Sequence, residues 1–219
     1  YQSAIPYIQK AEGGLSRAVT DTASRHPSPY IYNGVTGWHT NRGIKWETFE
    51  SLSGSGGYSV NEDNFIRMPD KIWLTIYKVG YWYPMKGDNY TSQAVANAVV
   101  DFAWAGGVGG ATRGLTRFMK SKGKEASSPG AIAEKFNELV KAQGEKKTFN
   151  DLIDYRKKWF LSLNQPANER GWLARMEVLR QQGISILGEF VKKNPIKTAI
   201  GAALIIGAIV GGIYLYNRK

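Results

Sequence analysis

The stretch TSQAVANAVVDFAWAGG at residues 91–107 decides the fold of this 219-residue chain. Val95, Val99 and Phe102 recur at the spacing of one helical face, and alanines with a further valine cover most of the remaining surface. A helix that is apolar nearly all round lies inside a protein. The segment therefore predicts the central helix of a mainly α fold.

The polar strip of this helix is narrow and holds Asn97 and Asp101 among alanines. A carboxylate in such a strip lies buried or in the wall of a cleft. Asp101 is therefore a candidate substrate-binding residue. The alternative is structural, because buried charges are normally paired and Asp101 would then accept hydrogen bonds from a neighbouring helix or loop end.

Helical patterns continue on both sides of the central segment. They cover residues 44–52, 63–85 with an end near Gly80, 152–163 and 171–193. Two basic, glycine-containing stretches, 120–130 and 141–147, predict solvated linkers. Residues 24–43 carry two prolines and an Asn-Gly turn signal, which predicts an extended loop or a short hairpin.

The charge of the chain predicts a polyanionic partner. Lys and Arg number 29 against 18 Asp and Glu, a formal charge of +11. Nucleic acid, an anionic membrane surface and the bacterial cell wall all fit this excess. The chain has no cysteine, which excludes disulfides, thiolate metal sites and cysteine nucleophiles. Its two histidines do not form an H-E-x-x-H pair, so neither a metal nor a cofactor is expected.

The C-terminal end predicts a membrane anchor. Residues 198–217, TAIGAALIIGAIVGGIYLYN, contain no charge and are bracketed by Lys and Arg on both sides. A helix of this length matches the roughly 30 Å hydrocarbon core of a bilayer. More basic residues precede than follow it, so the positive-inside rule places residues 1–194 in the cytoplasm. The alternative is that a leader, trimmed from the chain, puts them outside.

One face of this predicted transmembrane helix consists of small residues. Ala199, Ala203, Gly207 and Gly211 recur every four residues. Such a face allows two helices to approach closely, so a homodimer through these four residues is a prediction. Glycine is also common in membrane helices that do not associate, which leaves the monomer open.

Glu12 lies at the end of a short helical pattern near the N-terminus. It follows Ile8 by four residues on the apolar face of residues 3–12, and Gly13 and Gly14 then end the helix. Burial and the negative end of the helix dipole both disfavour the ionised carboxylate, as the role of a general acid requires. The alternative is a glutamate with a purely structural role at a helix end.

Three aromatic residues lie in stretches that read as loops: Trp38, Trp82 and Tyr83. Aromatic faces in such places stack on sugars or bases, so these residues are candidates for substrate binding. The alternative is that they pack in the core or at an interface.

The motifs EGGL at 12–15 and HTNRGIKWETF at 39–49, with Asp21 between them, resemble the N-terminal signature of glycoside hydrolase family 108, the lysozyme-like N-acetylmuramidases of phages and bacteria. Residues 95–119 and 156–179 resemble the helical region of this family that is described as peptidoglycan-binding. The resemblance covers about residues 1–180. It implies a catalytic half at 1–80 packed as one domain with a helical half at 81–180, followed by a basic juxtamembrane segment at 181–197 and the transmembrane helix.

The resemblance also implies a lysozyme-like fold and an activity. The chain is similar to enzymes that cleave the β-1,4 bond between N-acetylmuramic acid and N-acetylglucosamine in the glycan strands of peptidoglycan, without a cofactor. Glu12 would be the catalytic acid, with Asp21 or Thr40 as the second catalytic group. The predicted substrate-binding residues are Trp38, Asn41, Trp82, Tyr83 and Asp101. Two alternatives stay open: a lytic transglycosylase that uses the same glutamate, and a cell-wall-binding protein without turnover.

Overall fold

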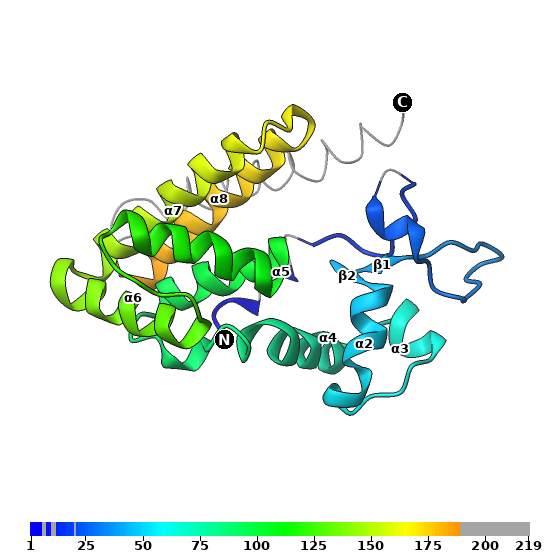
Figure 1. The fold of residues 1–219 in the computed structure, drawn as a ribbon. Coiled ribbons are helices and arrows are strands. Elements are labelled where there is room, and N and C mark those ends of the chain that lie inside the picture. The colour runs from blue at the N-terminus through cyan, green and yellow to red at the C-terminus, as the bar shows by residue number, and fades with distance from the viewer. Residues whose placement is uncertain (6–7, 10–11, 20, 189–219) are drawn as a thin grey trace. The chain divides into compact units, whose positions relative to one another are not determined.

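The computed structural model describes residues 1–5, 8–9, 12–19 and 21–188 (Figure 1). These residues form two compact units. The N-terminal unit comprises Gln2–Trp82, and the C-terminal unit comprises the described chain from Tyr83 onward together with Tyr1. Both units are built mainly from helices, which confirms the predicted mainly α class.

The N-terminal unit combines a small hairpin with short helices. The hairpin strands β1 (Thr40–Asn41) and β2 (Ile44–Lys45) are antiparallel, with Thr40 opposite Lys45. The other elements of the unit are the 3-10 helix η1 (Thr22–Arg25), the α-helices α2 (Trp46–Gly56), α3 (Glu62–Ile66) and α4 (Asp70–Tyr77), and the π-helix η2 (Lys78–Trp82).

Aromatic side chains fill the core of this unit. The Trp46 ring lies 5.6 Å from Phe49 and 5.0 Å from Phe65, measured between ring centres. Trp73 stacks on Tyr77 at 5.6 Å, and both rings are fully buried. Because α2, α3 and α4 all contribute rings to this core, they hold the hairpin that precedes them in a fixed place.

The predicted helix at 44–52 is present as α2, but the single helical pattern predicted for 63–85 is wrong. The helical structure is interrupted between α3 and α4, at Met68 and Pro69. Proline disfavours helical backbone in the residue before it, so α3 ends and Pro69 precedes the first turn of the next helix. Helical structure then extends beyond Gly80, because η2 continues directly from α4.

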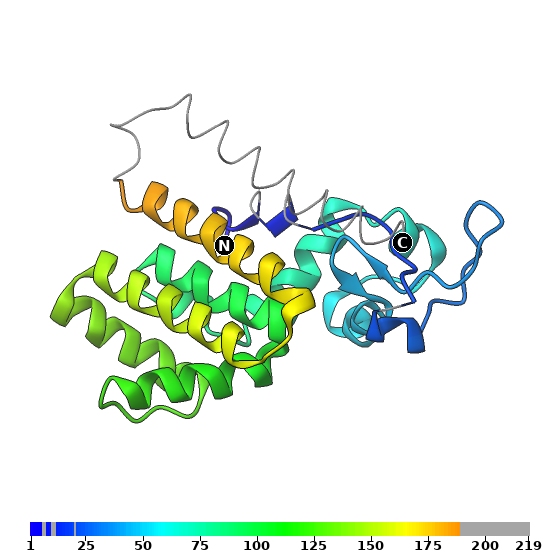
Figure 2. The same cartoon turned by 90° about the horizontal axis from the view of Figure 1, so that it is seen from above.

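The C-terminal unit is a bundle of four long helices preceded by the short 3-10 helix η3 (Gly87–Asn89). They are α5 (Gln93–Ser121), α6 (Pro129–Gln143), α7 (Glu145–Ser162) and α8 (Pro166–Ile186). Helix α5 packs against each of the other three, and α7 and α8 lie side by side in both views (Figures 1 and 2). This confirms the central position predicted for the segment 91–107.

Helix α5 is longer than predicted and is interrupted once. Gly107 has φ of 71° and ψ of 158°, and helical structure resumes after it as far as Ser121. A positive φ is unstrained in glycine, so the two helical stretches join through this one residue.

Of the two predicted linkers, one is present in the structure and the other is not. The first is present as the connection between α5 and α6. The second, at 141–147, is wrong, since α6 ends at Gln143 and α7 begins at Glu145. Gly144 alone makes this turn, with φ of 86°.

Two glycines of α8 predict opposite effects on stability. A Cβ at Gly183 would lie 2.1 Å from Cζ of Phe149 on α7, whereas a Cβ at Gly171 would meet nothing within 4 Å. We expect Gly183→Ala to lower the free energy of unfolding by about 1–3 kcal/mol through overpacking. Gly171→Ala is expected to raise it by about 0.5–1 kcal/mol, since alanine is the better helix former. Denaturant unfolding of both variants measures this difference, and equal effects would contradict the α7–α8 packing.

Residues 189–219 lie outside the described residues. The predicted transmembrane helix at 198–217, its small face of Ala199, Ala203, Gly207 and Gly211, and most of the juxtamembrane segment fall there. Within the described chain, no helix is both long enough and apolar enough to cross a bilayer.

Candidate active site

Glu12 stands where a short helical stretch ends. The Ile8 amide donates to the Ala4 carbonyl at 3.0 Å, and the Glu12 amide donates to the Ile8 carbonyl at 3.1 Å. This is the i to i−4 pattern of an α-helix. Ala4 and Ile8 are buried and Glu12 is half-buried, so Glu12 follows the apolar stripe that the sequence predicted.

The side chain of Glu12 lies directly on the turn of the hairpin. The two turn residues, Arg42 and Gly43, have φ of 51° and 78°, as in the tight two-residue turns that join antiparallel strands. A Cβ placed on Gly43 would lie 2.3 Å from Oε2 of Glu12 and 2.6 Å from its Cδ. Only glycine combines this backbone conformation with this close approach.

Arg42 ties the same turn to helix α4. Its Nη1 donates to the Met68 carbonyl at 2.9 Å, and its Nη2 pairs with Asp70 at 2.5 Å. The indole Nε1 of Trp73 donates to the Arg42 carbonyl at 3.0 Å. Two contacts from α4 and one from Met68, two residues before that helix, therefore fix the backbone of the turn that Glu12 contacts.

Thr40 belongs to the small sheet that this turn closes. The Ser16 amide donates to the Thr40 carbonyl at 2.8 Å, so the chain that follows Glu12 pairs with β1. The buried ring of His39 contacts the Thr40 hydroxyl through Nδ1 at 3.0 Å and the Ala18 carbonyl through Nε2 at 3.1 Å. A carbonyl only accepts, so a neutral ring carries its proton on Nε2, and Nδ1 accepts from Thr40. The lone pairs of the Thr40 oxygen then remain available to a further donor.

The charge of Glu12 affects the pKa of the Tyr81 phenol. Burial raises the pKa of Tyr81, a hydrogen bond with the Thr48 side chain opposes this, and the negative charge of Glu12 adds to the rise. The phenol therefore keeps its proton and can donate it in a hydrogen bond.

Sequence reasoning missed His39, Gly43 and Tyr81. A partial signal for Gly43 was present, because a glycine between two short β-like stretches is typical of a hairpin turn. No local pattern distinguished Tyr81 from the other aromatic residues around it.

A family match covers this site. Residues 5–107 match the model of the family described as glycosyl hydrolase 108. The chain carries a glycosyl hydrolase 108 domain. The match includes Glu12, Thr40 and Gly43, and it confirms both the predicted family and the predicted enzyme class, a glycoside hydrolase.

The fold also has a counterpart among solved structures. The structure of Brucella abortus SagA is similar with a TM-score of 0.60 and 22% sequence identity, over 87% of this chain and 96% of that chain. At this identity the similarity shows the fold alone. No curated protein sequence matches the chain.

The other predicted catalytic residue, Asp21, makes a local contact in the glycosyl hydrolase 108 domain. It caps η1, where its Oδ1 accepts from the Ala23 amide at 2.9 Å. A catalytic role for Asp21 stays a prediction.

Asn41 and Trp82 are buried in the N-terminal unit. The Asn41 amide group donates to the carbonyls of Phe65 and Ile66 at 2.7 and 2.9 Å, which joins β1 to α3. Both of its amide hydrogens are therefore used within the protein. Trp82 ends η2 with 1% of its surface exposed, so its predicted position in a loop is wrong.

Tyr83 and Asp101 belong to the C-terminal unit. Tyr83 is 51% exposed. Asp101 is buried in α5, where Oδ2 pairs with Arg156 at 2.9 Å and Oδ1 with Arg175 at 2.7 Å. Burial alone would raise the pKa of Asp101, but the two guanidiniums outweigh it and hold the pKa below its ordinary value. These two ion pairs occupy both carboxylate oxygens, as the structural alternative requires. A role of Asp101 in substrate binding stays a prediction.

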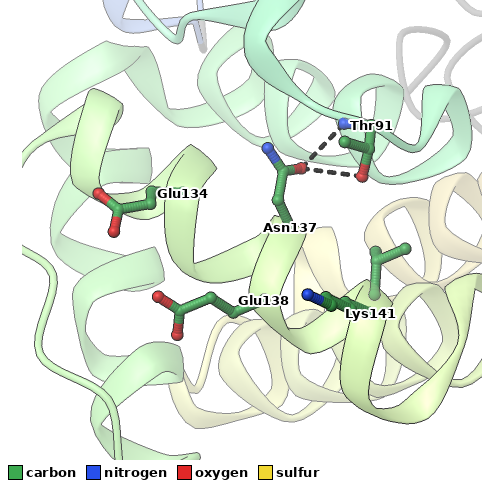
Figure 3. Close-up of a pocket in the computed structure, with 6 residues that line it drawn as sticks. Thr91, Glu134, Asn137, Glu138 and Lys141 are labelled. Carbon is green, nitrogen blue, oxygen red and sulfur yellow. Dashed lines mark hydrogen bonds between the residues drawn. The ribbon is translucent and has the colours of Figure 1, made fainter.

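The C-terminal unit also has a shallow pocket of about 450 Å³ between α6 and the start of α5 (Figure 3). The Thr91 amide and hydroxyl both donate to the side-chain oxygen of Asn137, at 2.8 and 3.1 Å. Glu138, on the same wall, pairs with Lys124 and Lys135. None of the predicted site residues lines it.

Acidic and histidine side chains do not gather into a metal site in the described parts of the chain. No group of three or more of them there is placed to hold an ion.

Proposed function

We propose that the glycosyl hydrolase 108 domain makes this protein a peptidoglycan hydrolase of the N-acetylmuramidase type. It cleaves the β-1,4 bond between N-acetylmuramic acid and N-acetylglucosamine, with Glu12 as the general acid. The observation that carries the proposal is the contact of the Glu12 carboxyl group with the fixed turn at Gly43. A lysozyme-like arrangement of the catalytic half goes with this proposal.

Glu12 donates its proton to the glycosidic oxygen as the bond to the sugar ring breaks. The leaving sugar then departs as an alcohol, and the positive charge that develops on the ring resembles an oxocarbenium ion. The fixed turn supports this role because a proton donor must keep hydrogen-bond distance to the leaving oxygen. The charge of Glu12 contributes to the raised pKa of Tyr81, so the phenol stays protonated and neutral in the electrostatic field of the carboxylate.

Thr40 supplies the second group in this proposal. Its hydroxyl proton is directed to His39, so its oxygen can accept a hydrogen bond from a water molecule and orient that water for attack on the sugar. The proton that this water loses as the new bond to the sugar forms passes to the surrounding solvent. Water activated at this position favours hydrolysis over the transglycosylase reaction, which uses no water.

The products of the reaction distinguish hydrolysis from transglycosylation and from binding without turnover. Full-length protein is incubated with purified peptidoglycan in water enriched in ¹⁸O, and the released fragments are measured by mass spectrometry. We expect reducing-end N-acetylmuramic acid that carries one ¹⁸O. Anhydro sugars without the label would instead show a lytic transglycosylase, and intact strands would show a wall-binding protein without turnover.

We also propose that residues 198–217 anchor the enzyme in a bacterial membrane. Their length without charge and their basic flanks support this. Carbonate extraction of membranes from expressing cells tests it, since an integral protein stays in the membrane pellet. Protease treatment of spheroplasts then determines on which side residues 1–194 lie.

A further inference from the structure

The guanidinium group of Arg17 lies over the ring of Trp38, next in the chain to residues of the candidate active site. Arg17 directly follows Ser16, which pairs with Thr40 across a β-bridge. The guanidinium carbon of Arg17 lies 5.7 Å from the centre of the Trp38 ring. Trp38 precedes Thr40 by two residues, and both are partly exposed, whereas His39 and Asn41 between and after them are buried. This alternation of burial places Trp38, which precedes β1, on the same outer side as Thr40.

Two contacts hold the Trp38 ring, and a backbone hydrogen bond holds the residue that carries it. The indole Nε1 of Trp38 donates to the Val35 carbonyl at 2.9 Å, and the Ser28 amide donates to the Trp38 carbonyl at 2.8 Å. Tyr32 meets the indole edge to face, with 6.3 Å between ring centres. The turn from Tyr32 to Val35 therefore fixes the indole, and the indole in turn restricts the Arg17 side chain.

Arg17, unlike Arg42 and Arg67, has no acidic partner among the described residues. Arg42 pairs with Asp70 and Arg67 pairs with Asp63, whereas Arg17 is exposed and makes no ion pair with any described residue. Its N–H donors face solvent in a planar fork, and this geometry matches a carboxylate. An arginine that is already held on a ring loses less conformational entropy when it binds.

We propose that Arg17, held by Trp38, is a subsite for a carboxylate of the substrate, and that it selects glycan strands on which the lactyl carboxyl group of N-acetylmuramic acid is free. This inference rests on the proposed function, since it assigns the ligand of a surface that adjoins Thr40. Strands whose lactyl groups are joined to peptides or otherwise uncharged bind less well.

Two strand preparations that differ only in charge test the subsite. Glycan strands are freed of peptides so that the lactyl carboxylates are exposed, and half of the sample is converted to methyl amides. Full-length wild-type protein is expected to cleave the carboxylate strands with a kcat/KM about tenfold above that for the amidated strands. Arg17→Gln is expected to abolish this preference by lowering kcat/KM on the carboxylate strands alone, and Arg17→Lys to restore part of it.

Arg25→Gln is the matched control. Arg25 is an exposed arginine at the end of η1 in the same unit, so its removal changes the net charge equally without touching Trp38. It should change the preference by no more than about twofold. Equal losses in Arg17→Gln and Arg25→Gln would overturn the proposal, because general attraction between opposite charges would then explain both.

The test also separates this inference from the proposed function. Binding of both strand preparations is measured by tryptophan fluorescence under the same conditions as cleavage. If wild-type protein binds but cleaves neither strand, the muramidase assignment fails while the carboxylate preference is still measured. If it cleaves both strands equally well and Arg17→Gln does the same, the muramidase assignment stands and the subsite is refuted.

Discussion

Glu12→Gln is expected to lower kcat for peptidoglycan cleavage by about 10²–10⁴-fold while leaving the fold intact. Glutamine has nearly the same shape as glutamic acid but cannot donate a proton to the glycosidic oxygen. The leaving sugar would then depart as an alkoxide. Zymography on peptidoglycan and release of soluble sugar fragments both measure the loss.

Glu47→Gln controls for the loss of one carboxylate. Glu47 is exposed in the first turn of α2, within the same unit as Glu12. Its replacement should leave kcat unchanged, since it makes no part of the site around the turn at Gly43. A Glu12→Gln variant that clears cell walls at the wild-type rate would show that another group is the acid.

Gly43→Ala is expected to lower kcat by about 10²-fold, because displacement of a catalytic group by about 1 Å has an effect of this size. The new Cβ would overlap the carboxyl group of Glu12, which must move away from the turn. The turn also becomes strained, since alanine at positive φ costs about 1–2 kcal/mol. The second effect alone would lower stability without an effect on catalysis.

Gly34→Ala separates these two effects. Gly34 occupies the same position in a matching turn between Tyr32 and Val35, where Asn33 and Gly34 have φ of 51° and 72°. A Cβ there would meet nothing within 4 Å. Both variants should lose similar amounts of unfolding free energy, but only Gly43→Ala should lower kcat. Any disturbance of Trp38 in Gly34→Ala would change substrate binding, and therefore KM, instead. Equal activity in the two, measured well below their melting temperatures, would contradict a role for Gly43 in positioning Glu12.

The sequence by itself determined the helical class, the central helix and the position of Glu12. These features depend on local order: the repeat of Val95, Val99 and Phe102 buries a face whatever the rest of the chain does. Two glycines after Glu12 likewise end a helical stretch without help from other elements. The resemblance of the motifs around Glu12 and Thr40 then pointed to the glycoside hydrolase family that the match over residues 5–107 confirms.

Predictions from hydrophobic periodicity and composition failed at two places, because a second effect overrode the pattern at each. The apolar repeat continues across Pro69, but proline disfavours helical backbone before it and divides the pattern into α3 and α4. The basic composition of residues 141–147 indicated a linker, but burial of Thr148 and Phe149 keeps α7 helical almost to Gly144. Proline decided the first outcome, and packing decided the second.

Only the tertiary structure decided what surrounds the charged groups. Asp101 pairs with Arg156 and Arg175, which follow it by 55 and 74 residues in the chain, so no local pattern could identify these partners. The contact of Glu12 with Gly43, the link from His39 to Ala18 and the approach of Tyr81 likewise join segments that are separate in the chain. Hydrophobic periodicity reports which face of an element is buried, but not which partner covers it. That choice depends on the packing of all elements together, because a buried polar group is stable only where the fold brings a partner to it.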